Sequence, residues 1–218
     1  EAKASYEKTQ ADFQKNYEAT ILNQQNSKAK TAANQYTIPV VFHILHMNGS
    51  ENVSDAQVNA ALAQVNADFA ATGSDYNNIF APFKALYNDA DIRFVLARKD
   101  PQGNCTSGII HTYDTRTNWD RNPPSSAGNS ALYAGITWTS TTRKYLNVIL
   151  VKDIVKDPND TQGGQVIGYT WLPGTWATNA IQDAIVYNSS HLSSLQARSL
   201  SHEIGHWLNL PHTFGNTN

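Results

Sequence analysis

Residues 202–212 place three histidines and one glutamate in a short stretch near the end of the chain. His202 and His206 are four residues apart, so on a helix they lie one above the other and can bind one ion together. Glu203 lies one step around that helix, beside the ion. The third histidine, His212, can reach the same ion only if the helix ends and the chain folds back. The spacing therefore requires a helix followed by a sharp turn.

The sequence contains signals for both ends of this helix. Asn209 stands where the chain must turn left-handed, a conformation that Asn accepts more readily than most residues. Pro211 cannot continue the helix and directly precedes His212. Upstream, residues 193–196 (Ser-Ser-Leu-Gln) have the pattern of a capping box, which predicts a start near residue 194.

Three imidazoles form a ligand set for Zn²⁺ that leaves a fourth position open for water, which is typical of catalytic zinc sites. Glu203 would be placed to take a proton from that water without occupying a coordination position. We therefore predict one catalytic zinc ion, with His202, His206 and His212 as its ligands.

The run HEIGHWLNLPHTFG resembles the metzincin zinc-peptidase signature HExxHxxGxxH, and most closely that of the pappalysin-like metallopeptidases. The resemblance covers residues 36–214. It implies zinc binding by the three histidines and a general-base role for Glu203. Asn209 stands where the family has Gly, and because Asn tolerates a left-handed turn we expect the geometry to survive.

This resemblance implies a secreted zinc-dependent endopeptidase that hydrolyses peptide bonds in a protein or peptide substrate, using a zinc-bound water activated by Glu203. The alternative is a latent or inactive zinc-binding recognition or adhesion module, whose zinc only stabilises the fold. Glu203 favours the enzyme, because a structural zinc site has no use for a base.

Metzincins carry a methionine-containing turn well downstream of the third histidine. The one methionine here is Met47, and the chain ends six residues after His212. We therefore expect residues 36–212 to be the catalytic (upper) subdomain, residues 213–218 to begin a truncated C-terminal subdomain, and the lower subdomain to be missing. Family members bind Ca²⁺ in that missing stretch, so no calcium ligand is assigned to this chain.

Residues 1–35 differ in composition and contain no Gly or Pro. By resemblance we predict an inhibitory prosegment, as in a zymogen, and the alternative is a solvated helix or an expression remnant. No cysteine precedes Cys105, so latency would need a carboxylate such as Asp12 or Glu18 to reach the zinc. Apolar residues recur at helical spacing as one thin stripe made of Tyr6, Phe13, Tyr17 and Ile21.

Composition limits the partners. The 218 residues suit one domain, and a net charge of −2 gives no reason to expect nucleic acid as a partner. No apolar run approaches the length of a membrane span. Only 16% of residues are charged, which favours an extracellular protein. Cys105 is the sole cysteine, either a small buried or loop thiol or half of a disulfide to a cysteine beyond residue 218.

The pattern of apolar residues predicts an α/β fold with a twisted mixed five-stranded sheet, a backing helix and the active-site helix. Residues 54–57 (Ser-Asp-Ala-Gln) form a second capping box, which opens the backing helix. That helix presents Val58, Leu62, Val65 and Phe69 on one face. The five strands are expected at residues 37–46, 92–97, 108–113, 146–151 and 168–172.

The stretch 163–170 resembles the edge strand above the metzincin cleft, to which an extended substrate adds as a further strand. This predicts substrate binding by Gly168, Tyr169 and Thr170, and the alternative is an ordinary edge strand. Asp183 could orient this segment or be a plain loop carboxylate. The four remaining histidines are expected to be hydrogen-bonded structural residues: His43, His46, His111 and His191.

Overall fold

The computed structural model describes residues 8, 11, 15, 35–120, 130–138, 144–155, 165–173, 182–193 and 198–212. Its strands are β1 (Tyr36–His46), β2 (Ile92–Leu96), β3 (Ile109–Tyr113), β4 (Asn118–Asp120), β5 (Leu146–Val151), β6 (Asp153–Val155), β7 (Gly168–Thr170) and β8 (Ala184–Asn188). Its helices are α2 (Asp55–Phe69), α3 (Ser130–Tyr133) and α4 (Arg198–Trp207), with short 3₁₀ segments between them.

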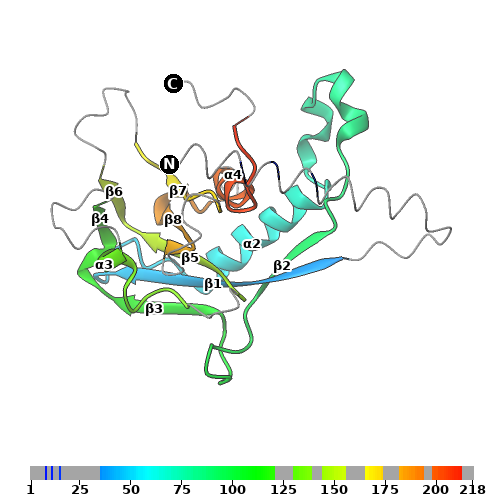
Figure 1. Cartoon of the computed structure of the whole chain (residues 1–218). Coiled ribbons are helices and arrows are strands. Elements are labelled where there is room, and N and C mark those ends of the chain that lie inside the picture. Colours follow the sequence, from blue (N-terminus) through cyan, green and yellow to red (C-terminus); the bar gives the residue numbers. More distant parts are fainter. Residues whose placement is uncertain are drawn as a thin grey trace.

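One mixed sheet organises the fold (Figure 1). Its strand order is β2-β1-β5-β8-β7, and β3 pairs with the second half of the long strand β1. All neighbours are parallel except β7, which runs antiparallel to β8 at one end of the sheet. Parallel strands are buried on both faces, which explains the continuous apolar runs of β1 and β5.

The predicted mixed α/β fold is confirmed, but the strand number is corrected. The described residues form a six-stranded sheet instead of a five-stranded one. The additional strand is β8, which lies between β5 and β7 and is fully buried. Its apolar run Ala184–Tyr187 is as short as many loop segments, so only its pairing with two neighbours defines it as a strand.

Helix α2 begins at the predicted capping box. The Ser54 side chain accepts from the Gln57 backbone N–H, and the Gln57 side chain accepts from the Ser54 backbone N–H. Three of its predicted core residues, Val58, Leu62 and Val65, are buried. Phe69 is partly buried against the same core. The backing helix is therefore confirmed, and with α4 it covers one face of the sheet (Figure 1).

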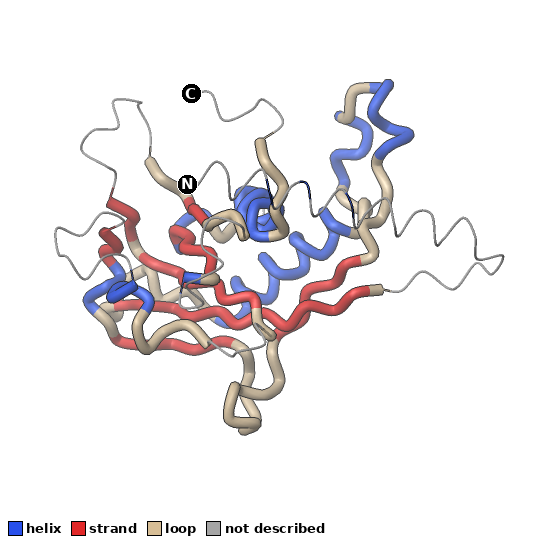
Figure 2. The backbone as a smooth tube through the Cα atoms, viewed as in Figure 1, coloured by secondary structure: helices blue, strands red, loops and turns tan. Residues whose placement is uncertain are grey.

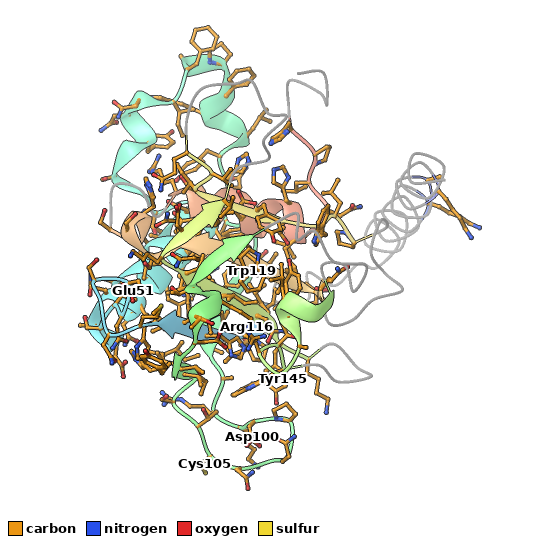
Figure 3. All side chains as sticks on the ribbon, turned by 90° about the vertical axis from the view of Figure 1, so that its left-hand side faces the viewer. Glu51, Asp100, Cys105, Arg116, Trp119 and Tyr145 are labelled. Carbon is orange, nitrogen blue, oxygen red and sulfur yellow. The ribbon has the colours of Figure 1, made fainter. Side chains whose placement is uncertain are left out.

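The other face of the sheet is covered by aromatic residues of β4 and α3. Trp119 and Tyr133 are fully buried there against strands β5, β7 and β8. The Trp119 indole N–H donates to the Tyr169 hydroxyl at 2.8 Å, and the Tyr133 hydroxyl lies 3.1 Å from the same oxygen. Figure 3 marks Trp119 within this layer. These bonds tie the edge strand β7 to the rest of the fold through Tyr169.

His43 on β1 is buried, and its Nε2 lies 3.1 Å from the Asn147 Oδ1. Burial lowers the pKa of His43 from 6.5 to about 4. Between pH 6.5 and about 4, the unfolded chain therefore binds a proton at the His43 imidazole, and the folded chain does not. Stability from this residue is complete above pH 6.5 and is lost as the pH falls towards 4.

We expect this loss to reach about 3 kcal/mol at the lower end of the range. Urea unfolding of the wild type and of a His43→Gln variant across the range measures it, because Gln keeps an N–H for Asn147 and cannot titrate. The wild type should lose about 3 kcal/mol more than the variant. Parallel pH curves for the two proteins would contradict the prediction.

Two features project from the core. The 3₁₀ helices η1 (Ser74–Asn78) and η2 (Ala81–Leu86) form an arm with Phe80 and Phe83 exposed (Figure 2). Cys105 is exposed in the loop at the bottom of Figure 3, and a disulfide to a cysteine beyond residue 218 stays an open alternative. None of the described helices is long and apolar enough to cross a membrane.

The predicted prosegment (residues 1–35) lies outside the described residues, apart from residues 8, 11, 15 and 35, the first three of which are helical and exposed. Residues 213–218 lie outside them as well, and so do residues 194–196 of the capping box predicted before the metal helix. The described part of α4 begins at Arg198. The domain boundaries stay predictions.

Candidate active site

The end of helix α4 forms the turn that the sequence requires. The Leu210 N–H donates to the Gly205 carbonyl at 2.9 Å, and the Asn209 N–H donates to the His206 carbonyl at 2.8 Å. This pair of bonds defines a Schellman motif, whose C′ residue must be left-handed. Asn209 occupies that position with φ = 74°, so the predicted helix stop is confirmed.

The turn brings the three predicted histidines together. The Nε2 atoms of His202 and His206 lie 2.9 Å apart, and His212 Nε2 lies 3.0 Å from His206 Nε2 and 3.3 Å from His202 Nε2. Among the described residues, these three form the one group of His, Cys, Asp or Glu with metal-ligand spacing. The zinc-ligand role itself stays a prediction.

The donor set fits a zinc ion. His206 Nδ1 lies 2.7 Å from the Leu210 carbonyl oxygen, which needs a proton on Nδ1 and so leaves a lone pair on Nε2. Three ring nitrogens that face one another in this way repel unless a cation lies between them. Zinc bonds of about 2.0–2.1 Å at tetrahedral angles would set ligand nitrogens about 3.4 Å apart, close to the observed spacing.

Glu203 lies on the same helix and shares a cleft with the three histidines. Burial raises the pKa of the Glu203 carboxyl from 4.5 to about 7. Burial also lowers the pKa of His202, with a further contribution from the neighbouring imidazoles. Both shifts describe the site without a cation, and a bound cation would favour ionised Glu203 and neutral imidazoles.

The cleft has a volume of about 370 Å³ and is bounded by the predicted substrate strand β7. All three predicted substrate-binding residues, Gly168, Tyr169 and Thr170, line it. The Tyr169 side chain is buried on the opposite face of the sheet, so its backbone is what it can offer to the cleft. In the described part of the chain, no strand pairs with the free edge of β7.

Gly168 leaves room for both β8 and the catalytic helix. A Cβ atom there would lie 2.7 Å from the Tyr187 ring, 3.2 Å from the Val186 carbonyl oxygen and 3.3 Å from Glu203 Cγ. Any side chain would therefore push β7 away from β8 or displace Glu203. This crowding is a sufficient reason for glycine at position 168.

We expect Gly168→Ala to lower the free energy of unfolding by about 1–3 kcal/mol, as overpacking does elsewhere. Gly205→Ala is the matched control on α4, because a Cβ there would meet only the flexible Leu210 side chain at 3.7 Å. The control should be neutral or gain about 0.5–1 kcal/mol from helix propensity. Chemical denaturation measures the free energy of unfolding of both variants. Equal values would contradict the explanation of Gly168 by crowding.

Asp183 and Asn147, which both lie outside the motif, connect the end of α4 to the sheet. The Trp207 indole N–H donates to Asp183 Oδ1 at 2.8 Å, which joins the end of α4 to the residue before β8. Asp183 is therefore more than a plain loop carboxylate, although its bond is to α4. The Asp183 carbonyl accepts from Asn147 Nδ2 at 3.3 Å. No local pattern in the sequence predicts this connection, because Trp207 and Asp183 are 24 residues apart and Asp183 and Asn147 are 36 residues apart.

The other histidines lie elsewhere, and each makes a hydrogen-bond contact as predicted. His46 Nδ1 accepts from the Asn48 N–H, and His111 lies between Asn52 and Asp55. His191 Nε2 lies 3.4 Å from the Gln165 side chain. With His43 bonded to Asn147, all four are structural.

Comparisons with known proteins agree with this site. A peptidase family model described as pregnancy-associated plasma protein-A matches residues 132–217. A structure of mirolysin in complex with compound 9 is 30% identical with a TM-score of 0.70, and covers 84% of this chain and 67% of that chain. No curated protein matches the sequence.

Two further solved structures are similar. Mature mirolysin of Tannerella forsythia in complex with a cleaved peptide is 31% identical with a TM-score of 0.68, covering 84% of this chain and 67% of that chain. A promirolysin mutant of Tannerella forsythia is 29% identical with a TM-score of 0.67, covering 83% of this chain. The present chain spans only 57% of that proform.

The fold and these likenesses define a metzincin-type metallopeptidase. The chain belongs to the pappalysin-like family of metzincins, as the motif suggested. It is thus a metalloendopeptidase, a hydrolase that acts on peptides, and its family implies a catalytic zinc.

Proposed function

We propose that this chain is a secreted zinc-dependent endopeptidase in which Glu203 is the general base. The convergence of three imidazole nitrogens beside the half-buried carboxylate of Glu203 is the observation that carries the proposal. His202, His206 and His212 would hold the zinc ion. When bound, zinc supplies a Lewis acid that acidifies water and polarises a peptide carbonyl.

The chain's own residues would do the remaining work. Glu203 accepts a proton on its carboxylate as water attacks the scissile carbonyl, and then delivers that proton to the leaving amine. The carboxylate is partly desolvated at the wall of the cleft, which limits the water around it. The His206 ring is held in one orientation by the Leu210 carbonyl.

Strand β7 would hold the substrate in an extended conformation. Its free edge can offer backbone N–H and C=O groups, so a peptide could add as a further strand beside Gly168, Tyr169 and Thr170. The complex of mature mirolysin with a cleaved peptide supports peptide binding by this chain too. Specificity would then depend on side-chain pockets next to this edge.

Residues 1–35 are proposed to be an inhibitory prosegment. The existence of a promirolysin form supports a zymogen for this chain too. Secretion is supported by the low content of charged residues, 16%.

Removing the metal tests the proposal. We expect a chelator to abolish peptide hydrolysis, and added Zn²⁺ to restore it. The protein should stay folded throughout, because the apolar core formed by the sheet and α2 does not depend on the site. Circular dichroism and a fluorogenic peptide assay on the same samples distinguish the functions. Unfolding on chelation, with no hydrolysis before it, would favour the zinc-stabilised recognition module.

A further inference from the structure

The last turn of α4 is joined to the sheet by a hydrogen bond between two side chains. Trp207 directly follows His206 and is the final residue of the helix. Its indole N–H donates to Asp183 Oδ1 at 2.8 Å. Because Asp183 directly precedes β8, this bond connects the predicted metal helix to a central strand.

Asp183 is itself held in place by a buried amide. Asn147, 2% exposed on β5, donates from Nδ2 to the Asp183 carbonyl at 3.3 Å. The Asn147 Oδ1 accepts from the Trp138 N–H at 2.7 Å and lies 3.1 Å from His43 Nε2. The backbone of Asp183 is therefore tied to strand β5, and its carboxylate can hold the end of α4 in place.

The last turn of α4 and the chain that follows it position two of the three clustered imidazoles. His206 lies just before Trp207, and the Schellman turn through Asn209 directs the chain to His212. The same turn places the Leu210 carbonyl 2.7 Å from His206 Nδ1. A rotation of this last turn would move His206 and His212 together, away from His202. Holding Trp207 therefore holds the geometry of the cluster.

We propose that Asp183 is a positioning residue, which fixes the last turn of α4 through Trp207 so that the three imidazole nitrogens are arranged for zinc before it binds. This inference rests on the proposed function, since it takes the three histidines as zinc ligands. A carboxylate suits the role, because hydrogen bonds to a charged acceptor are stronger than those between neutral groups.

Two substitutions remove the bond from opposite ends. Asp183→Ala removes the acceptor, and Trp207→Phe removes the donor while keeping an aromatic ring against the core. Asp183→Asn is the conservative variant, because its amide oxygen can still accept. Asn66→Ala is the matched control: Asn66 ties α2 to β2 through two bonds of 2.8 Å with Phe94, away from the site.

Two measurements separate positioning from general stability. The first is the zinc dissociation constant, by competition with a chelator, and the second is amide exchange at Leu210 in zinc-free protein. We expect Asp183→Ala and Trp207→Phe to weaken zinc binding about 10–100-fold, as other outer-shell changes do. Leu210 should exchange about tenfold faster, because the local opening of its turn becomes easier.

The control and conservative variants should behave differently. Asp183→Asn should restore zinc affinity to within about threefold of the wild type, and Asn66→Ala should lower Tm while leaving zinc affinity within about twofold. Unchanged zinc affinity and Leu210 exchange in Trp207→Phe would overturn the inference, even if Asp183→Ala failed to fold. A wild type that binds no zinc would instead overturn the proposed function. The amide exchange of Leu210 in zinc-free protein would still show whether Asp183 stabilises the turn.

Discussion

Replacing Glu203 with Gln is expected to slow peptide hydrolysis by about 10²–10⁴-fold while leaving zinc binding intact. The amide has the size and shape of the carboxylate but cannot accept a proton. Because Glu203 lies beside the three imidazoles and is not one of the clustered groups, the metal should be unaffected. Steady-state kcat/KM and zinc content of the purified variant measure the two effects separately.

Glu51→Gln is the matched control for this substitution. Glu51 is a buried glutamate, 3% exposed, whose carboxylate accepts from the Met47 and Gly49 N–H groups in a loop far along the chain from α4. Its replacement should lower stability and leave kcat/KM near that of the wild type. If Glu203→Gln kept a wild-type rate, Glu203 would not be the general base.

The second large effect is expected at the third histidine. His212→Ala should weaken zinc binding by more than about 100-fold, beyond the range seen for outer-shell residues, and abolish hydrolysis. Two imidazoles on one helix would remain, and they leave the ion with fewer protein ligands than catalytic zinc sites use. Chelator competition measures the affinity directly.

His111→Ala serves as the control for this change. His111 contacts Asn52 and Asp55 near the start of α2, outside the cluster. Its loss should leave zinc affinity and hydrolysis unchanged. Equal zinc affinity in the wild type and in His212→Ala would remove His212 from the ligand set.

The sequence was sufficient wherever the determinants were local. Asn209 predicted the left-handed helix end, and the capping box at Ser54 predicted the start of α2, because caps depend on residues within one turn. The clustering of the three histidines followed from the same local geometry. These predictions needed no knowledge of the rest of the chain.

What the sequence missed depends on contacts between distant residues. The run at Ala184 becomes a central strand only through pairing with β5 and β7. Gly168 is explained by the crowding of Tyr187 and Glu203, which lie 19 and 35 residues further on. The Asp183–Trp207 bond likewise joins two elements that only the folded sheet brings together. No local pattern encodes such neighbours.

A mass-spectrometric cleavage map tests the central claim most directly. Zinc-loaded protein spanning residue 36 onward, with any natural downstream sequence, would be incubated with a complex peptide mixture beside its Glu203→Gln counterpart. We expect cuts that occur only with intact Glu203, and the residues flanking them would define the specificity. A folded, zinc-loaded wild type that cuts nothing, or identical cuts by both proteins, would contradict hydrolysis by this site.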